Sequence, residues 1–468
     1  MLQTKFQQRT KELLNEEYDA FEKALDMQPP VSVRINPHKP AADIQESVPW
    51  CETGRYLPER PSFTFDPLFH AGTYYVQEAA SMFLEQAILK IFAGKEPSDK
   101  QVTALDLCDA PGGKSTLLQT LIPAESLLVC NEVIRSRCMI LAENMAKWGM
   151  PNNIVTNNDP KDFKHLAHTF DIILADLPCS GEGMFRKDTA SRDEWSVDNV
   201  KLCASRQRRI IHDVWDALKP GGWLIYSTCT FNTEENEDNV QTLAGELGAE
   251  IVSIPVKVEW NIAGALCHDM PVYRFFPHRT RGEGFFLALM QKHDEPLKTI
   301  KAKAKNKSNK QQVTISAQIK NMLSEPDKFI FHAIQPAKQQ TKSVQETTII
   351  NAIPEAHNNI YNLLREHLNI ISSGILMGEL KGKDFIPAIP LAMSIELCRE
   401  SFPSINLSYE QAIKYLQREA VAMPEGTPTG YILITYKDVP LGFVKNIGNR
   451  ANNLYPQEWR IRGRYNAL

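Results

Sequence analysis

Two cysteines lie in sequence settings that suit a reactive thiol. Cys179 belongs to Asp-Leu-Pro-Cys-Ser-Gly-Glu-Gly, residues 176–183, and Cys229 belongs to Ser-Thr-Cys-Thr, residues 227–230. Each follows an apolar run that predicts a buried strand, and open α/β sheets bind their ligands where strands end. We therefore expect both thiols at a ligand crevice. Cysteine is otherwise a small core residue in most reduced proteins, and that interpretation covers six others: Cys51, Cys130, Cys138, Cys203, Cys267 and Cys398.

A glycine-rich loop is the second feature with chemical potential. Asp106 ends an apolar run and is followed by Leu-Cys-Asp-Ala-Pro-Gly-Gly-Lys-Ser, residues 107–115. Paired glycines let a backbone approach a ligand closely, and the helix that follows offers free N–H groups. A phosphate-binding P-loop would need glycine where Cys108 stands. Pro111 also removes a backbone donor, and Asp109 adds negative charge, so we expect a cofactor that is not a nucleoside triphosphate.

Acidic residues recur where the predicted strands end. They are Asp106, Asp109, Glu132, Asp159 and Asp176. A triphosphate would be repelled by these charges, whereas a sulfonium cation that carries a ribose would be stabilised. Glu132 suits the two ribose hydroxyls, as in dinucleotide-binding folds, and Asp159 could accept from an adenine amine. A single acid of this kind usually only solvates a loop, but five at successive strand ends favour a ligand site. We expect no metal site, because no cysteine or histidine pair has metal-ligand spacing.

A scaffold of alternating strands and helices between residues 102 and 290 must position these side chains. The predicted strands are 102–107, 126–132, 153–159, 170–178, 223–230 and 282–292. The predicted helices begin near residue 111 and cover 133–148, 198–218 and 233–247. This repeat predicts a Rossmann-like α/β core with a parallel sheet covered on both faces. Before it we expect a helix over 3–25, a strand over 31–36 and a helix over 75–92.

The composition is that of an ordinary globular protein. The 468 residues are 43% hydrophobic and 23% charged, and the net charge of −4 excludes a basic footprint over the whole chain. No run of 18 apolar residues occurs, which argues against a membrane span. Nine cysteines are an odd and modest number for this length, which argues against a disulfide framework. Charges occur throughout the first 20 residues, so the sequence predicts no apolar segment of a signal peptide there. We therefore expect a reduced, cytoplasmic protein that works as a monomer.

The three motifs, in this order, resemble those of the NOL1/NOP2/Sun family of RNA cytosine-carbon-5 methyltransferases. The resemblance extends over residues 30–292 and includes Arg-Ile-Asn at 34–36, Tyr-Val-Gln-Glu-Ala-Ala-Ser at 75–81 and matching residues within 275–286. It implies a Rossmann-like methyltransferase core, S-adenosylmethionine as cofactor and RNA as partner. The C-terminal extension resembles that of a bacterial enzyme of this family, which implies small-subunit (16S) ribosomal RNA as the substrate.

The resemblance also assigns roles to residues of this chain. It implies that Cys229 is the nucleophile, that Cys179 assists product release and that Asp176 serves both catalysis and cofactor binding. The cofactor-binding residues that it implies are Cys108, Asp109, Ala110, Pro111, Gly112, Gly113, Lys114, Glu132, Asp159 and Asp176. Leu177 departs from the small residue common at this place in the family, and we expect it to change the wall near the base.

The resemblance and the composition together predict five parts along the chain. They are an N-terminal α/β RNA-binding subdomain (1–93), the methyltransferase core (94–293), a lysine-rich linker (294–314), a helical connecting region (315–379) and a PUA-like RNA-binding module (380–468). The linker contains six lysines and no acid between residues 298 and 310. It either only separates domains or also touches phosphates. Near the C-terminus, residues 430–446 have the pattern of a β-hairpin.

The reaction explains why two thiols and an acid are needed. Carbon 5 of cytosine is a poor nucleophile, and a thiolate that adds to carbon 6 makes carbon 5 able to accept a methyl group. Cys229 must therefore be partly ionised, and Lys114 or Arg186 could supply the nearby positive charge. A protonated Asp176 could hold N3 of the base. Cys179 could act as the base that removes the carbon 5 proton, or position that base.

The contacts with RNA are less specific in the sequence. We consider six basic residues as RNA contacts, or alternatively as solvated helix surface: Arg186, Lys187, Arg192, Arg206, Arg208 and Arg209. Phe185 could stack on a base, and Arg34 could either contact RNA or form a salt bridge within the N-terminal subdomain. Two rival functions stay open, a P-loop NTPase and a non-catalytic RNA-binding factor.

Overall fold

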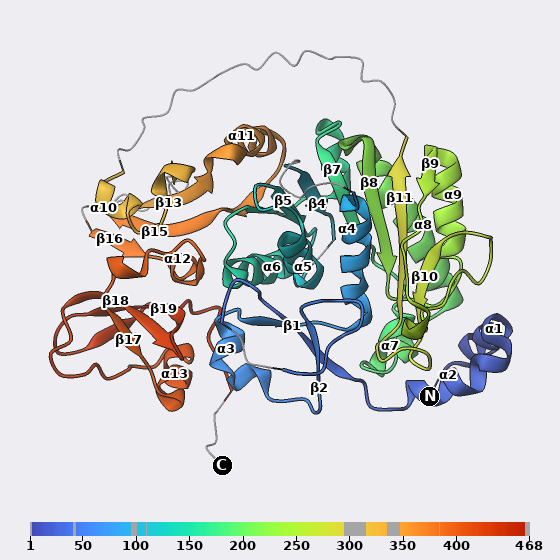
Figure 1. The fold of residues 1–468 in the computed structure, drawn as a ribbon, viewed down its shortest axis with the longest axis horizontal. Coiled ribbons are helices and arrows are strands. Elements are labelled where there is room, and N and C mark those ends of the chain that lie inside the picture. Colours follow the sequence, from blue (N-terminus) through green and yellow to red (C-terminus); the bar gives the residue numbers. More distant parts are fainter. Residues whose placement is uncertain are drawn as a thin grey trace.

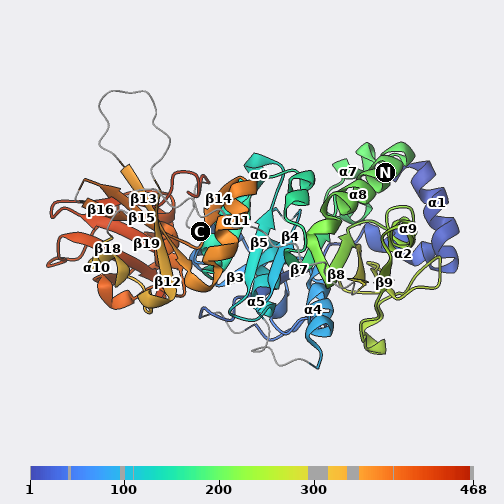
Figure 2. The same ribbon diagram turned by 90° about the horizontal axis from the view of Figure 1, so that it is seen from above.

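The computed structural model describes residues 2–40, 44–94, 101–108, 110–293, 315–334, 347–382 and 384–463. Asp109 and the expected linker, residues 294–314, lie outside the described residues. The described chain forms an N-terminal part, a central sheet covered by helices, and a C-terminal part (315–463) beside one edge of that sheet (Figures 1 and 2). Among the residues that the structure describes, no helix is both long and apolar enough to cross a membrane.

The N-terminal part consists of two helices and a small sheet. The elements are α1 (Thr4–Leu14), α2 (Tyr18–Leu25), β1 (Val31–Ile35), β2 (Gly54–Leu57), α3 (Pro67–His70) and β3 (Tyr74–Val76), with antiparallel order β2-β1-β3. The helix expected over 3–25 is broken near Asn15, whose φ is 48°. The helix expected over 75–92 begins only at α4 (Leu84–Phe92), because Tyr74–Val76 pairs with β1 instead.

The central sheet confirms the Rossmann-like prediction. Its parallel strands are β4 (Thr103–Asp106), β5 (Leu127–Asn131), β6 (Asn153–Thr156), β7 (Phe170–Asp176) and β8 (Leu218–Thr228), in spatial order β6-β5-β4-β7-β8. Four antiparallel strands extend its edges: β9 (Ala249–Ile251), β10 (Val272–Phe275), β11 (Phe285–Lys292) and β14 (Ile370–Ser373). The order reverses beside β4, which is where such sheets bind ligands.

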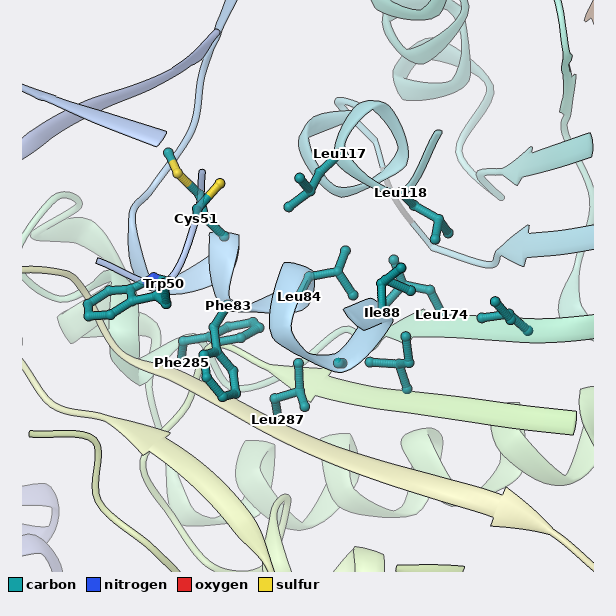
Figure 3. Close-up of a cluster of buried hydrophobic side chains, with 14 of the residues drawn as sticks. Trp50, Cys51, Phe83, Leu84, Ile88, Leu117, Leu118, Leu174, Phe285 and Leu287 are labelled. Atoms are coloured by element: carbon teal, nitrogen blue, oxygen red, sulfur yellow. The ribbon is translucent and has the colours of Figure 1, made fainter. Parts of the chain in front are cut away.

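Alternation along each strand feeds two apolar cores, one on each face of the sheet. On β7, Ile172 and Leu174 face one core, while Ile173 and Ala175 face the other, and all four are at most 1% exposed. The first face is covered by α4, α5 (Gly113–Leu121) and α6 (Arg135–Trp148), and Figure 3 shows part of this core. The second face is covered by α8 (Val197–Val214), α9 (Glu237–Leu247) and α11 (Asn358–His367). A short helix, α7 (Ala190–Glu194), precedes α8.

The C-terminal part contains two four-stranded sheets. The first is β12 (Phe329–Ile334), β13 (Thr347–Pro354), β15 (Ile375–Lys381) and β16 (Asp384–Pro387). The second is β17 (Ser404–Asn406), β18 (Gly430–Tyr436), β19 (Val439–Asn446) and β20 (Ala451–Asn453), with helices α10 (Ala317–Lys320), α12 (Ile389–Met393) and α13 (Tyr409–Leu416) nearby. The predicted hairpin at 430–446 is confirmed, and its turn residues Lys437 and Asp438 both have positive φ.

The prediction of a helical region over 315–379 is wrong. Strands β12, β13, β14 and most of β15 lie in it, and the expected boundary at 379/380 falls inside β15. The β-branched residues of Thr347–Pro354 pair with strands on both sides, so tertiary pairing decides their conformation. β14 pairs with β6 and thereby makes the C-terminal part a structural extension of the central sheet.

Candidate functional site

The strand ends bring together the residues expected to act on the base. Asp176 and Ser227 are paired residues of β7 and β8, and the Ser227 hydroxyl donates to Asp176 Oδ1 at 2.7 Å. Lys114 Nζ, from the first turn of α5, lies 2.8 Å from Asp176 Oδ2. The carboxylate therefore joins the glycine-rich loop to the strand end that precedes Cys179. Leu177 is 3% exposed and packs into the second apolar core, so the wall effect expected of it has no support.

The two expected cysteines form the centre of this site. Cys179 Sγ and Cys229 Sγ lie 3.1 Å apart, and both side chains keep some exposure. The hydrogen bond with Cys229, followed by burial, raises the pKa of Cys179 well above its usual value. The Gly183 amide donates to the Cys229 carbonyl oxygen at 2.8 Å, which ties the two motifs together. A thiol that holds its proton thus lies in contact with a second, partly accessible thiol.

The glycine-rich loop is held open by α6. Gly112 precedes α5 with φ of 113°, and a Cβ there would meet Leu141 at 3.1 Å, so glycine is needed at this position. Arg137 donates to the Ala110 carbonyl at 2.6 Å, and Asn144 donates to the Pro111 carbonyl at 2.7 Å. Cys108 is half-buried against the second apolar core, while Gly113 begins α5. The loop therefore leads with two glycines into the N-terminus of α5.

The acids that were expected to bind the cofactor lie at successive strand ends. The Glu132 side chain follows β5, is 3% exposed and accepts from the Ile134 amide at 2.8 Å. Asp159 follows β6, is half-buried and accepts from the Lys161 amide at 3.1 Å. Asp106 differs, because it is fully buried and accepts from Ser115, which makes it a support for the loop.

Two asparagines that the sequence analysis missed fasten these strand ends to one another. Asn131 donates to the Leu107 carbonyl at 3.1 Å and to the Asn158 carbonyl at 3.0 Å, and it accepts from the Asn158 amide at 3.0 Å. The Asn369 amide, just before β14, donates to Asn158 Oδ1 at 2.9 Å. The C-terminal part therefore holds the loop that carries Asp159. The position of Asn131 and Asn158 beside predicted strand ends was the signal available in the sequence.

A buried polar network behind Cys179 was also missed. Glu235 is fully buried and accepts from the Ser180 amide at 3.0 Å, from Gln207 at 2.8 Å and from Asn232 at 2.8 Å. Glu182 is 2% exposed and accepts from the amides of the chain just after Cys229. Residues 233–247 had been interpreted only as a helix, but the run of acids at its start was the available signal.

Three residues that were expected to contact RNA are engaged in contacts within the protein instead. Phe185 is 1% exposed, with its ring centroid 5.0 Å from that of Phe6, so the prediction that it stacks on a base is wrong. Arg186 pairs with Glu283 at 3.0 Å, and this buried ion pair excludes the expected role of Arg186 beside Cys229. Arg192 donates to the Phe185 carbonyl at 2.7 Å and helps to fasten the N-terminal helices.

The remaining basic residues divide into exposed and paired ones. Lys187, Arg206 and Arg209 are exposed, whereas Arg208 is half-buried and donates to Asn239 at 2.6 Å. Only the exposed three remain available as RNA contacts among the six that were considered, within the described residues.

The burial of Arg34 excludes the RNA contact that was considered for it from the sequence. Arg34 is fully buried, donates to Gln77 at 2.8 Å and to Thr116 of α5, and lies 4.4 Å from the centre of the Trp148 ring. This arginine therefore anchors the N-terminal sheet on the helix that follows the glycine-rich loop.

One further cluster has ligand atoms of the kind that bind metals. Asp238, Cys267 and His268 come within 4.8 Å of one another at the surface. His268 Nε2 lies 2.8 Å from Asp238 Oδ1, so a hydrogen bond accounts for this contact.

The strand order and the strand-end site define a Rossmann-like, S-adenosylmethionine-dependent methyltransferase with an added N-terminal domain and a C-terminal PUA domain. The model of 16S rRNA methyltransferase RsmB/F matches residues 95–291. Models of the RsmF N-terminal domain and PUA domain match residues 2–79 and 402–461. The chain belongs to the ribosomal RNA small subunit methyltransferase F family, because the relative from Aliivibrio fischeri strain MJ11 is 31% identical over 428 residues, 88% of this chain and 85% of that protein.

Other relatives support the same assignment. The corresponding methyltransferase of Aliivibrio salmonicida is 30% identical over 419 residues, again 88% of this chain and 85% of the relative. A methyltransferase homologue from Pyrococcus horikoshii is 26% identical with a TM-score of 0.52, over 62% of this chain and 95% of that one. NSun6 from the same organism, solved with SFG, has a TM-score of 0.51 at 19% identity, over 63% and 99% of the two chains, and shows the shared fold.

The residues present fit S-adenosylmethionine. The cradle at Gly112 leaves room only for backbone, and carboxylates follow β5 and β6, where a ribose and a purine amine would lie. When bound, this cofactor supplies an electrophilic methyl group on a sulfonium. Gly112 and Gly113 would hold it through backbone, while Glu132 and Asp159 would accept its hydrogen bonds.

Proposed function

We propose that this protein methylates carbon 5 of a cytidine in 16S ribosomal RNA through a covalent bond between Cys229 and carbon 6 of the base. The contact of 3.1 Å between Cys179 Sγ and Cys229 Sγ carries the proposal. A binding protein would need neither thiol, whereas addition and later expulsion of a cysteine need both a nucleophile and a second group beside it. Ribosomal RNA as substrate rests on the names of the relatives.

We assign a task to each residue on the basis of these contacts. Cys229 adds to carbon 6, and Asp176, held by Lys114 and Ser227 at the end of β7, would hold N3 of the base. The carbon 5 proton must then pass to a base, and the bond from carbon 6 to sulfur must break. Cys179 lies in contact with the sulfur that leaves, so its S–H can stabilise the departing thiolate. The target base must first leave its stack.

A denaturing gel tests this division of roles. The protein would be incubated with S-adenosylmethionine and 16S ribosomal RNA, as wild type, Cys179→Ala and Cys229→Ala. We expect Cys179→Ala to accumulate a protein–RNA adduct and Cys229→Ala to form none. The reverse pattern would exchange the two roles, and methyl transfer without any adduct would exclude the covalent route.

Ligand binding and methyl transfer together distinguish the proposed function from the two rival functions considered from the sequence. A P-loop NTPase would bind ATP, and a non-catalytic RNA-binding factor would transfer no methyl group to any RNA. We expect S-adenosylhomocysteine to bind and ATP not to bind. We also propose that the protein acts as a monomer in the cytoplasm, and sedimentation at micromolar concentration tests the first part.

A further inference from the structure

The turn that carries Cys179 is held from both sides by one buried carboxylate. Glu235 Oε2 accepts from the Ser180 amide at 3.0 Å, directly after the cysteine. The same oxygen accepts from Gln207 Nε2 at 2.8 Å, and Gln207 Nε2 also donates to the Pro178 carbonyl at 3.1 Å. The residues before and after Cys179 are therefore fixed through Glu235, so this carboxylate sets where the Cys179 sulfur lies.

Glu235 acts much less directly on the other thiol. Its second oxygen, Oε1, accepts from Asn232 at 2.8 Å, and Asn232 in turn donates to the Thr230 hydroxyl at 3.0 Å. Thr230 follows Cys229, so one extra side chain stands between the carboxylate and the Cys229 segment. A charge on Glu235 therefore bears more strongly on Cys179 than on Cys229.

The surroundings of Glu235 are mostly acidic or neutral. Burial raises the pKa of Glu235 to about 7, with the charge of Glu182 adding to the effect, while hydrogen bonds from Ser180 and Asn232 lower it. The other titratable groups near it are Cys179 on the turn, Cys203 on α8, and Tyr226 on β8 with Arg208 beyond it. The charge of Glu235 is one of the contributions that raise the pKa of Cys179, after its hydrogen bond with Cys229 and burial.

We propose that Glu235 is a positioning residue that keeps the proton of the thiol pair on Cys179, so that Cys229 carries the negative charge. This inference rests on the proposed function. One proton between two sulfurs 3.1 Å apart can stay on either, and a nearby carboxylate disfavours a second negative charge on the sulfur that it faces. Cys179 then donates its S–H to the Cys229 thiolate, which forms the bond to carbon 6. The environment of the two cysteines, more than their motifs, thus decides which one attacks.

Alkylation of the free protein tests the proposal without RNA or methyl transfer. Iodoacetamide reacts with thiolates, and mass spectrometry gives the modified fraction of each cysteine. For the wild type, we expect Cys229 to be modified in preference to Cys179, with a preference that grows as pH rises through about 7, where Glu235 ionises. For Glu235→Gln, we expect the ratio of Cys179 to Cys229 modification to rise about tenfold, as for a change of one pKa unit, and the dependence near pH 7 to disappear.

Two further variants separate charge from structure. Gln207→Met removes the hydrogen bonds to Pro178 and to Glu235 Oε2 but keeps the carboxylate. Methyl transfer should therefore fall, and the alkylation ratio should still change with pH, with its transition moved to higher pH because the charged carboxylate has lost a donor. Glu234→Gln, next in the chain and paired with Arg9 at the surface, should leave methyl transfer, ratio and profile unchanged. A folded Glu235→Gln with the wild-type ratio and profile would overturn the inference, as would Gln207→Met with the profile expected of Glu235→Gln. The adduct gel tests the proposed function independently.

Discussion

Gly183→Ala should disturb the pair of cysteines that we propose as catalytic, without touching either sulfur. A Cβ at Gly183 would lie 2.7 Å from the carbonyl oxygens of both Cys229 and Gly284, and 3.0 Å from Gly284 Cα. All three neighbours are backbone atoms, so no flexible side chain can move aside. Because ordinary contact begins at 3.4 Å, the segments must separate by about 0.7 Å in a close-packed interior. That movement falls on the hydrogen bond from the Gly183 amide to Cys229.

The size of the effect follows from this displacement. A shift approaching 1 Å at a reacting group can cost about 100-fold in rate, so we expect kcat to fall by about 10- to 100-fold. Overpacking of this kind should also lower the free energy of unfolding by about 1–3 kcal/mol. The affinity for S-adenosylhomocysteine should hold within about threefold, because the glycine-rich loop is on other strands.

The assay combines methyl transfer from labelled S-adenosylmethionine, calorimetric titration with S-adenosylhomocysteine and urea unfolding. Gly181→Ala is the matched control, since Gly181 has φ of 75° but an added Cβ would meet nothing within 4 Å. It should lose about 1–2 kcal/mol of stability from backbone strain while keeping most of its kcat. A Gly183→Ala protein with wild-type kcat, or equal kcat losses in both variants, would refute the reasoning.

Three further predictions concern the parts that hold the site. Phe185→Ala should lower the free energy of unfolding in urea by about 3–5 kcal/mol and leave the RNA affinity of the folded protein unchanged. A variant with wild-type stability but weaker RNA binding would instead support stacking of Phe185 on a base. Glu237→Ala should lower the free energy of unfolding by about 3–5 kcal/mol, because it leaves the buried Arg274 without its charged partner. Replacing both Glu237 and Arg274 by methionine should lower it by less, and equal losses in the two variants would argue against this role of the ion pair. Hydrogen bonds from Arg279 and then His278 lower the pKa of Glu17 to about 2, so its stabilisation is present above pH 4.5 and is lost as pH falls toward 2. Glu17→Gln should therefore flatten the loss of stability between pH 5 and 3 in urea unfolding, and an unchanged slope would contradict this.

The amino-acid sequence by itself predicted the chemistry that we propose and most of the core. Nearly continuous apolar runs such as 170–178 predict buried parallel strands, and the carboxyl ends of such strands meet at one edge of a sheet. Cys179 and Cys229 could therefore be placed together from local pattern alone, and the structure places their sulfurs in contact. The hairpin at 430–446 was equally readable, because its two strands are neighbours in the chain.

Tertiary structure alone decided which of the candidate RNA contacts are engaged within the fold. Phe185 and Arg186 look available in the sequence, but the N-terminal helices cover them, and contacts between residues more than 150 positions apart leave no local signal. The strands within 315–379 were missed because their pairing partners, and not their own propensity, stabilise them. Glu235 was missed for the same reason. Its burial against Ser180 and Gln207 arises only when β7, β8 and α8 pack together, and that burial gives an ordinary glutamate its influence over Cys179.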